Sequence, residues 1–323
     1  MALFDLSEDL LRSYRPALAE PDDFDSFWAA TLQEARAHQL KLTVTPADNG
    51  LALIDTFDVT FAGYAGNPVK AWLHLPVTRT GPLPAVVEYV GYGGGRGLPH
   101  ERPLWAMAGY AHFIMDTRGQ GAKGPQGDTP DPDPAGDPAS PGFTTRGIAS
   151  PETYYYRRVF TDAVRAIDAV RQLPAADPSR VAVAGTSQGG GIATAAAGLV
   201  SGLVAAMPDV PFLADFPRAL TITDALPYAE ITGYLKVHRE KRDQVMRTLS
   251  YFDTVNHAKR ASASALYSVA LMDHTCPPST VYASYNHYAG PKQIRVYPFN
   301  GHEGGQAFHE AEKLRFAAKP LSG

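Results

Sequence analysis

The sequence predicts a single α/β domain in which helices flank a mainly parallel central sheet, with a helical insertion after the sixth strand. Short apolar runs bounded by glycine and proline alternate with amphipathic stretches along most of residues 1–323. Buried parallel strands have this character because helices cover both faces of their sheet. Hydrophobic residues make up 45% of the chain, enough for a large core. The length of 323 residues would allow two domains, but the alternation resumes after the insertion, which favours one.

The chain opens with a helical extension, predicted over residues 1–40. Phe24 and Trp28 belong to an apolar stripe with helical spacing in this segment. Two strands are predicted next, at 56–61 and 69–75. Their alternating pattern indicates a half-exposed antiparallel pair.

Two apolar runs, 85–90 and 111–116, have the length and the flanking breakers of central strands. The following segment, 121–151, is too rich in glycine and proline for a helix, and we expect it to form a subunit contact or to rim a binding pocket. A strong amphipathic pattern then predicts a helix over 155–173, which Pro174 ends.

The rest of the chain continues the strand–helix alternation with one interruption. Residues 209–262 are mixed and mostly helical, and they form the predicted insertion. Strands are predicted at 181–184, 203–207, 265–272 and 293–298, and helices at 188–199, 279–288 and from about 303 onward.

Composition excludes several classes of function. The 29 basic and 33 acidic residues give a net charge of −4, so neither nucleic acid nor an anionic membrane is an expected partner. Cys276 is the single cysteine and cannot form an intrachain disulfide, and the first residues lack the basic region of a signal peptide. We therefore expect a cytoplasmic protein. The uncharged stretch 181–208 is built from glycine, alanine, serine and threonine, which favours a buried strand and helix over a membrane span.

The most informative motif is Gly-Thr-Ser-Gln-Gly at residues 185–189, which matches G-x-S-x-G. A predicted strand precedes it and a predicted helix follows, which is the context of a nucleophile elbow. Ser187 would occupy a strained turn, and glycines two residues before and after it would avoid clashes of a β-carbon. The motif predicts that Ser187 is a nucleophile at the end of a central strand.

A serine nucleophile needs a base that is oriented by an acid. In the α/β-hydrolase arrangement these follow the serine in the order acid, histidine, each in a loop after a strand. Asp273 directly follows the strand 265–272, and His302 follows the strand 293–298. Both residues therefore lie where this topology places the acid and the base. The competing candidates are weaker by position: His274, His287, His309, Asp215, Asp224 and Asp253.

The negative oxygen that forms during acyl transfer needs two hydrogen-bond donors. One is expected to be the backbone amide of Gln188, which follows the nucleophile. The other should come from a loop after an early central strand, and the amide of Tyr92 in the glycine-rich segment 91–97 is the best candidate.

Cofactor motifs are not satisfied. The glycines at 91–97 do not match G-x-G-x-x-G in any register, and no Walker-A sequence occurs. His302-Glu303 begins like a zincin motif, but Gln306 stands where the second histidine would be. Ten dispersed histidines and one cysteine give no convincing ligand set, so neither a metal nor a cofactor is expected.

Several motifs together resemble the acetyl xylan esterase/cephalosporin-C deacetylase family, carbohydrate esterase family 7, nearly from end to end. Arg-Gly-Gln, Gly-x-Ser-Gln-Gly and His-Glu in this order are highly specific to that family. The residues that carry the resemblance include Leu3-Phe4-Asp5-Leu6, Asp25, Phe27-Trp28, Gly91-Tyr92, Arg118-Gly119-Gln120, Tyr154-Tyr155-Tyr156-Arg157, Ser187-Gln188-Gly189-Gly190-Gly191, Leu249-Ser250-Tyr251-Phe252-Asp253, Asp273, Pro277-Pro278-Ser279-Thr280-Val281, Tyr285-Asn286-His287 and Gly301-His302-Glu303.

The resemblance implies an α/β-hydrolase that removes acetyl groups from short xylo-oligosaccharides and from cephalosporin C. It implies that Ser187, His302 and Asp273 form the catalytic triad and that the amides of Tyr92 and Gln188 form the oxyanion hole. Arg118 and Gln120 match the family's structural motif behind the site, where a buried arginine would need paired acceptors. Family members are cytoplasmic and typically hexameric, as trimers of dimers that enclose a cavity.

Some positions depart from the family pattern. Phe143 stands where many relatives carry a tryptophan near the pocket, and Gly304-Gly305 replace bulkier residues. Arg96, in the unusually glycine-rich loop 93–97, is expected beside the pocket mouth. These departures leave the acyl-chain and alcohol preferences open.

Two other readings remain beside that of an acetyl esterase. An α/β-hydrolase could instead be an esterase or peptidase for another small acyl substrate, since the fold alone does not set the bond that is cleaved. A catalytically silent ligand-binding scaffold is the non-enzymatic alternative. The intact set of Ser187, Asp273, His302 and two oxyanion donors argues against it.

Overall fold

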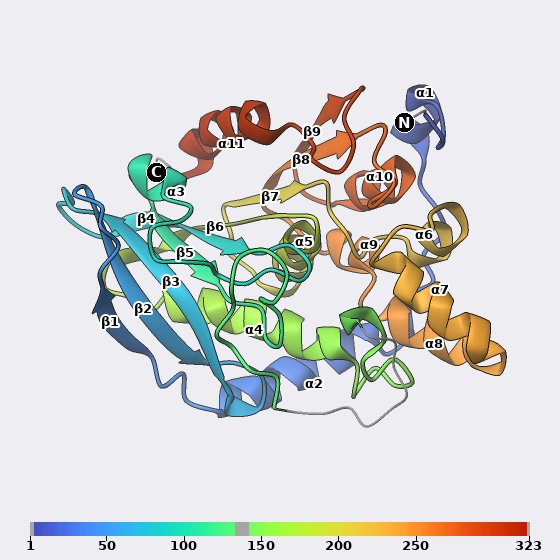
Figure 1. Ribbon diagram of the computed structural model, residues 1–323, viewed down its shortest axis with the longest axis horizontal. Coiled ribbons are helices and arrows are strands. Elements are labelled where there is room, and N and C mark those ends of the chain that lie inside the picture. Colours follow the sequence, from blue (N-terminus) through green and yellow to red (C-terminus); the bar gives the residue numbers. More distant parts are fainter. Residues whose placement is uncertain (1–2, 133–141, 322–323) are drawn as a thin grey trace.

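The computed structural model describes residues 3–132 and 142–321. In this part of the chain a twisted nine-stranded sheet runs through the molecule and helices cover both of its faces (Figure 1). The strands are β1 (Thr43–Ala47), β2 (Ile54–Ala62), β3 (Pro68–Pro76), β4 (Leu83–Tyr89), β5 (Ala111–Met115), β6 (Ala176–Thr186), β7 (Ala205–Asp209), β8 (Ser264–Ala270) and β9 (Lys292–Tyr297).

The helices differ widely in length, from single turns to α4 and α11. They are α1 (Glu8–Ser13), α2 (Phe24–Ala37), α3 (Leu104–Met107), α4 (Tyr155–Val170), α5 (Gln188–Leu199), α6 (Phe216–Ile222), α7 (Tyr228–Val237), α8 (Arg242–Ser250), α9 (Thr254–Ala258), α10 (Pro278–His287) and α11 (Gln306–Leu321). Short 3₁₀ turns occupy Tyr64–Gly66, Phe143–Thr145 and Arg239–Lys241.

The strand order is β1-β2-β3-β5-β4-β6-β7-β8-β9. β1, β2, β3 and β5 pair antiparallel, and every pair from β5 through β4 to β9 is parallel. The predicted fold class is therefore confirmed, as a mixed sheet whose larger part is parallel. One strand escaped prediction: β1 is mostly exposed and contains Pro46, so it shows no apolar alternation. Because of β1, the helical insertion follows the seventh strand rather than the sixth.

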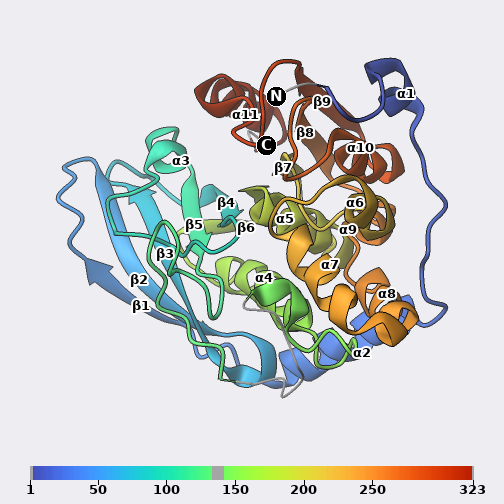
Figure 2. The same ribbon diagram turned by 45° about the vertical axis from the view of Figure 1, so that its right-hand side comes forward.

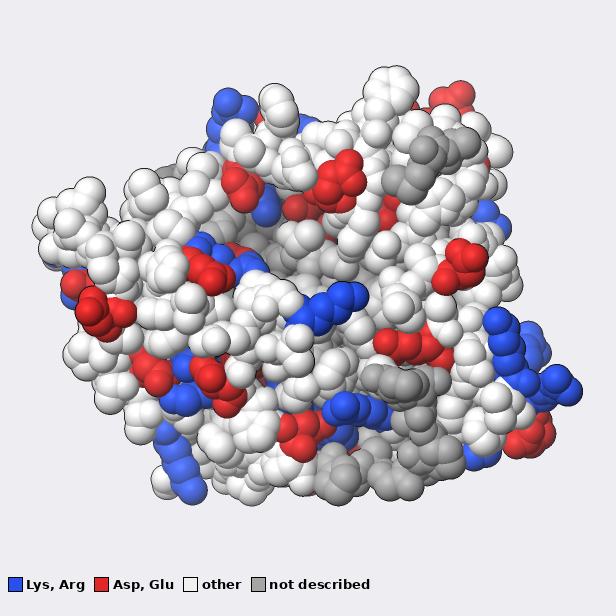
Figure 3. All heavy atoms as spheres, viewed as in Figure 1, with Lys and Arg blue, Asp and Glu red and all other residues white. Residues whose placement is uncertain are grey.

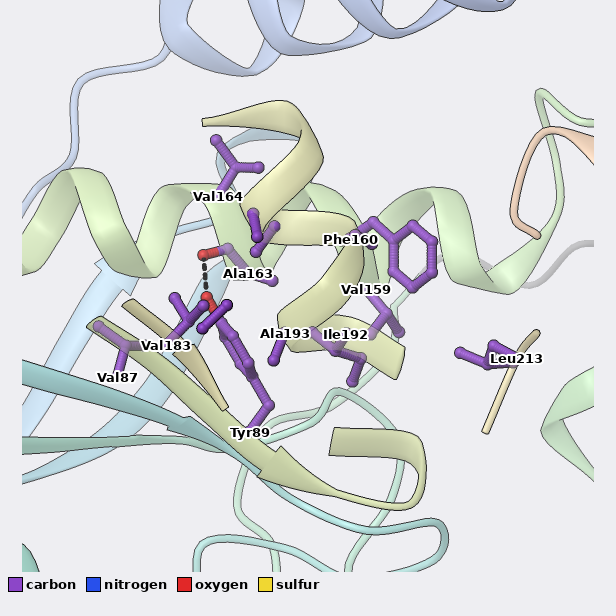
Figure 4. Close-up of a cluster of buried hydrophobic side chains, with 14 of the residues drawn as sticks. Val87, Tyr89, Val159, Phe160, Ala163, Val164, Val183, Ile192, Ala193 and Leu213 are labelled. Atoms are coloured by element: carbon purple, nitrogen blue, oxygen red, sulfur yellow. Dashed lines mark hydrogen bonds between the residues drawn. The ribbon is translucent and has the colours of Figure 1, made fainter. Parts of the chain in front are cut away.

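The central strands bury both faces, and alternate residues supply two different cores. On β4, Val87 and Tyr89 pack with α4 and α5, whereas Val86 joins Trp105 of α3 and Leu321 of α11 on the opposite face. Figure 4 shows the first of these cores, where the Tyr89 hydroxyl donates to the backbone oxygen of Ala163 at 2.9 Å. Such two-sided burial fixes the register of the central strands and so the position of their carboxyl ends.

The insertion and the N-terminal segment lie beside the same end of the molecule. Helices α6 to α9 connect β7 to β8, and the N-terminal segment runs along their outer side from α1 to α2 (Figure 2). The Asp5 carboxylate accepts the backbone amide of Ser279 at 2.7 Å and pairs with Arg218 at 2.9 Å. The segment thereby ties the insertion to α10.

Within the described residues, no helix combines the length and the apolarity that crossing a bilayer would require.

Three histidines are buried so deeply that the cost of burying a charge keeps them neutral. Burial lowers the pKa of His74 to about 3, that of His257 to about 3 and that of His309 to about 4. In the unfolded chain these side chains titrate near pH 6.5. The folded state therefore binds fewer protons than the unfolded state below that pH, and acid favours unfolding.

We expect each of these histidines to cost about 1.4 kcal/mol of unfolding free energy between pH 7.5 and pH 5.5, because the unfolded chain alone takes up the proton. His257→Phe tests one of them, since its neighbours are Phe24, Trp28 and Phe160. In this variant the Tyr251 carbonyl loses its contact with His257 but still accepts a hydrogen bond from the Trp28 indole, so it is not left without a partner. Urea unfolding of the parent and the variant at both pH values measures this. The unfolding free energy of the variant should change by about 1.4 kcal/mol less between the two pH values, and an equal change in both proteins would contradict the conclusion that folded His257 is neutral.

Candidate active site

Ser187 lies in a sharp turn between β6 and α5. Its backbone has φ 58° and ψ −119°, a left-handed conformation that a non-glycine residue rarely adopts. The turn is held by hydrogen bonds on both sides, from the Ser187 amide to the Asp209 carbonyl at 2.8 Å and from the Phe212 amide to the Ser187 carbonyl at 2.9 Å. The strain is therefore offset by contacts with the segment after β7.

The glycines of the motif leave no room for a side chain. A β-carbon at Gly185 would lie 2.3 Å from the carbonyl carbon of Gly189, and one at Gly189 would lie 2.0 Å from the backbone oxygen of Tyr89. One at Gly191 would lie 2.2 Å from the oxygen of Phe212. These distances explain why the turn needs glycine at each position.

The structure brings Ser187, His302 and Asp273 together in one hydrogen-bonded chain. The Ser187 Oγ lies 2.9 Å from Nε2 of His302, and Nδ1 of His302 lies 2.8 Å from Oδ2 of Asp273. A neutral imidazole with its proton on Nδ1 donates to Asp273 and accepts the serine hydroxyl at Nε2. This is the connectivity of a serine–histidine–aspartate triad.

Asp273 is fully buried, and its second oxygen is committed to the loop that follows it. Oδ1 accepts the backbone amides of Thr275 at 2.8 Å and Cys276 at 2.9 Å. The carboxylate thus holds its own loop with one oxygen and His302 with the other. His302 remains 34% exposed, so substrate can reach it.

Cys276 is buried close to the triad. Burial, together with the Asp273 carboxylate, raises the pKa of the Cys276 thiol well above its usual value, which keeps it protonated. Ligand atoms of Asp273, Cys276 and His302 lie within 4.8 Å of one another, the one such group among the described residues. Two of the three already hydrogen-bond each other, as acyl transfer requires.

The two predicted oxyanion residues lie on adjacent segments. Gln188 begins α5, so its amide is one of the unpaired donors at that helix N-terminus. Tyr92 follows β4, and it lines the same pocket as Ser187. The register that pairs Tyr89 of β4 with Gly185 of β6 places the ends of both strands side by side.

Gln120 connects these two segments. Its Oε1 accepts the amide of Gly93 at 2.6 Å, and its Nε2 donates to the side-chain oxygen of Gln188 at 2.9 Å. The side-chain NH₂ of Gln188 donates back to Oε1 of Gln120 at 3.1 Å, and the Tyr156 hydroxyl donates to the side-chain oxygen of Gln188 at 2.9 Å. The side chain of Gln188 therefore fixes the site from behind while its backbone amide stays available.

Arg118 is fully buried and paired. Its guanidinium makes two hydrogen bonds to the Asp162 carboxylate, at 2.6 and 2.8 Å, and lies 3.5 Å from Asp131. Arg158 also pairs with Asp131, at 2.6 Å. The acceptors that a buried arginine needs are thus present, and the pairing of Asp131 with Arg158 anchors segment 121–151 to α4.

A pocket of about 580 Å³ opens over the Ser187 hydroxyl, within the size range of small-molecule sites. The face drawn in Figure 3 is hollowed near its centre, in the region where β6 meets α5 in the matching view of Figure 1. The lining is mostly apolar and comes from the oxyanion loop, segment 121–151, the insertion and the triad. The lining residues are Gly91, Tyr92, Gly93, Ala122, Lys123, Gly142, Phe143, Ser187, Leu226, Pro227, Glu230, Thr275 and His302.

Phe143 lies in this lining, and Arg146 stacks on its ring at 4.2 Å. Both described ends of segment 121–151 rim the pocket, while residues 133–141, which belong to the expected subunit contact, lie outside the described residues.

The expectation for Arg96 is wrong. Arg96 is buried away from the pocket lining, with its guanidinium 3.8 Å above the Trp72 ring and paired with Asp58 and Asp128 at 2.8 Å each. These acceptors come from β2 and from the segment after β5. The glycine-rich backbone lets the loop fold inward, and the arginine then satisfies its charge beneath it.

The competing residues have other partners. The His274 ring stacks on Phe4 with centroids 3.9 Å apart, and His287 contacts the carbonyl of Pro16. Asp215 and Asp253 accept backbone amides at the starts of α6 and α9. His309 is buried beside Tyr297, and Asp224 is exposed.

Sequence reasoning missed the pocket residues that come from the insertion. Leu226, Pro227 and Glu230 stand in no recognisable motif. Lys123 was likewise not singled out. The one signal was position: an insertion after the strand that follows the elbow has to cross the carboxyl edge of the sheet.

A family model described as acetyl xylan esterase (AXE1) matches residues 1–320 of the chain. Acetyl esterase Axe7A of Xylanibacter ruminicola is 28% identical, over 92% of this chain and 66% of that protein. The chain therefore spans slightly less than two thirds of the length of this relative.

Two solved structures are similar over almost their whole lengths. An acetyl xylan esterase from Paenibacillus sp. R4 has a TM-score of 0.92 and 41% identity, covering 97% of this chain and 99% of that chain. Acetyl xylan esterase 1 from Thermoanaerobacterium sp. JW/SL YS485 has a TM-score of 0.91 and 32% identity, covering 98% and 99%. The Pyrococcus horikoshii acylaminoacyl peptidase shares the fold at 15% identity, with a TM-score of 0.58 over 84% of this chain and 42% of that one.

Proposed function

Because this chain belongs to the acetyl xylan esterase family and is therefore a carboxylic ester hydrolase, we propose that it removes acetyl groups from small acetylated sugars through an acyl-enzyme. The observation that carries the proposal is the hydrogen-bonded chain from Ser187 through His302 to Asp273 at the base of an open pocket.

The geometry supports a two-step reaction. Ser187 Oγ attacks the acetyl carbonyl carbon while Nε2 of His302 takes the hydroxyl proton, and Asp273 stabilises the resulting imidazolium. The carbonyl oxygen becomes negative and receives hydrogen bonds from the amides of Tyr92 and Gln188. When the C–O bond to the sugar breaks, His302 donates its proton to the leaving alcohol.

The second step regenerates the enzyme. Water attacks the acetyl-serine ester and passes a proton to His302, a tetrahedral intermediate forms in the same oxyanion hole, and acetic acid leaves as Ser187 recovers its proton, to ionise in the solvent. Every proton transfer in this scheme uses Nε2 of His302, and no cofactor takes part.

We expect this enzyme to prefer acetyl over longer acyl groups and esters over amides. Tyr92, Phe143, Leu226 and Pro227 line the pocket beside Ser187. Two additional methylenes that have to fit against these side chains should cost about tenfold in kcat/KM. The test is turnover of p-nitrophenyl acetate, the butyrate ester and an aminoacyl-anilide side by side. A faster anilide would indicate a peptidase, and equal rates for acetate and butyrate would contradict the proposed selectivity.

The natural alcohol is a finer proposal. Acetylated xylobiose and cephalosporin C are the substrates proposed on the family resemblance, and measuring acetate release from each under the same conditions decides between them. Cytoplasmic location is proposed on the single, buried cysteine. A hexamer is proposed on the resemblance alone, and a mass measurement in solution tests it.

A further inference from the structure

A single carboxylate from the insertion joins two loops that form the pocket. Glu230 lies in the first turn of α7 and lines the same pocket as Tyr92. The Tyr92 hydroxyl donates to this carboxylate, with distances of 2.7 Å to Oε1 and 2.8 Å to Oε2. Hydrogen bonds to an ionised group are short and roughly twice as strong as neutral ones. Glu230 therefore connects the oxyanion loop directly to the insertion.

The same carboxylate also holds the segment that carries Phe143. Oε2 accepts the Thr144 hydroxyl at 2.6 Å and the Thr144 amide at 3.1 Å. The Phe143 amide donates to the Tyr92 hydroxyl oxygen at 2.7 Å. We call this set of contacts among Tyr92, Phe143, Thr144 and Glu230 the Glu230 junction.

Protein donors take up most of the acceptor capacity of the Glu230 carboxylate. An ionised carboxylate offers about four acceptor sites, and three donors (the Tyr92 hydroxyl, the Thr144 hydroxyl and the Thr144 amide) already bind its two oxygens. A β-carbon at Gly142 would lie 1.8 Å from Oε1, so the backbone also closes against the carboxylate. The junction is built to position protein groups rather than to bind a ligand.

Tyr92 remains a donor throughout the usable pH range. Burial, with the nearby Glu230 carboxylate, raises the pKa of the Tyr92 phenol well above its usual value. The hydroxyl therefore keeps its proton, and remains able to donate, at the neutral to mildly alkaline pH of an esterase assay.

The oxyanion loop depends on such an anchor because glycines flank Tyr92. Gly91 and Gly93 carry no β-carbon, and Gly93 has φ 82°, so steric contacts restrict the backbone on either side of Tyr92 only weakly. On one side Gln120 holds the Gly93 amide at 2.6 Å. The Gly93 carbonyl also accepts the amides of Gly121 at 3.1 Å and Lys123 at 3.0 Å. The side chain of Tyr92, held by Glu230, is a further fixed point and ties the loop to the insertion.

We propose that Glu230 is a positioning residue that aims the Tyr92 amide at the reacting oxygen by holding the Tyr92 hydroxyl. The inference rests on the proposed function, because the oxyanion forms only if Ser187 attacks an acyl carbon. Glu230 touches neither Ser187 nor the reacting atoms, and it acts through Tyr92.

The decisive variant is Tyr92→Phe, which removes one hydroxyl and keeps the ring and the backbone amide. We expect kcat/KM for p-nitrophenyl acetate to fall about 10- to 100-fold, mainly in kcat, because a misaimed donor weakens the transition state more than the ground state. The affinity for a trifluoromethyl ketone, which Ser187 converts to a bound oxyanion, should fall by the same factor. Glu230→Gln should lose less, since an amide oxygen can still accept the phenol.

The matched control is Tyr154→Phe. The Tyr154 hydroxyl donates to the Thr144 carbonyl at 2.9 Å, so this variant weakens the same segment without touching Tyr92. It should lower the melting temperature and leave kcat/KM within about threefold. In the double variant Tyr92→Phe/Glu230→Gln, the two losses should not multiply.

Three outcomes would overturn the positioning role. They are a change below twofold in Tyr92→Phe, an equal loss in Tyr154→Phe, or a loss in KM with unchanged affinity for the ketone. Glu230→Ala is a secondary variant, and the conclusion does not depend on its folding. If Ser187→Ala kept its activity, the proposed function itself would fail, and that result is distinguishable from all three.

Discussion

Replacing Ser187 with alanine is expected to lower kcat for p-nitrophenyl acetate by about four to six orders of magnitude, the range seen when a triad nucleophile is removed. The substitution removes the attacking oxygen and leaves the oxyanion donors in place. Residual hydrolysis should then proceed by direct attack of water. The burst of p-nitrophenol that marks acyl-enzyme formation should vanish from stopped-flow traces.

Folding should survive this change. Alanine has to adopt the same left-handed backbone as Ser187, but the backbone bonds to Asp209 and Phe212 that hold the turn do not involve the side chain. The melting temperature should therefore stay within a few degrees of the parent. Ser201→Ala, at an exposed position beyond the same helix, is the matched control and should retain full activity. A burst that persists in Ser187→Ala would indicate another nucleophile.

Asp273→Asn should lower kcat by about 10⁴-fold for a reason that this structure makes specific. The Thr275 and Cys276 amides donate to one side of the carboxylate, so an asparagine would direct its carbonyl oxygen toward them. Its NH₂ group would then face Nδ1 of His302 and donate to it. His302 would carry its proton on Nε2, where it could no longer accept the proton of Ser187.

The prediction is checked by steady-state kinetics together with a crystal structure or NMR of the imidazole. Asp224→Asn changes an exposed acid in the same way and should leave kcat unchanged. If Asp273→Asn retained more than about a tenth of the activity, His302 would not depend on Asp273 for its tautomer, and the acid assignment would be wrong.

The elbow could be predicted from sequence because its requirements are local. Gly185, Ser187 and Gly189 lie within five positions, and the clashes that demand glycine arise between the turn, the helix after it and the neighbouring strand. The roles of Asp273 and His302 could be predicted for a different reason. Parallel strands present their carboxyl ends on one edge, so a residue just after a strand can be placed without knowing any side-chain contact.

Arg96 and Glu230 show where this reasoning stops. The direction of each side chain is determined by partners far along the chain. Arg96 pairs with Asp58 and Asp128, and Glu230 accepts hydrogen bonds from Tyr92 and Thr144. No periodicity or spacing in the sequence marks such contacts. A glycine-rich loop indicated that the backbone would bend but not which way its one charged side chain would turn.

The edge strand β1 illustrates a second limit. Period-two patterns arise from burial on one face, and β1 is exposed along almost its entire length. Its pairing with β2 is made by the backbone, which is the same for every residue type. The residue preferences that identify central strands therefore do not identify an exposed edge strand.

The wide separation of the triad along the chain has a consequence for biosynthesis. Ser187 and His302 are 115 residues apart, and the Asp5 carboxylate caps the first turn of α10 across 274 residues. A ribosome adds about 5 to 20 residues per second, so the elbow emerges several seconds before its base does. Throughout that interval the nascent chain exposes an unassisted serine hydroxyl, which is a poor nucleophile. Ester cleavage thus begins only after His302 has been made, because a chain truncated before β9 lacks the base that activates Ser187.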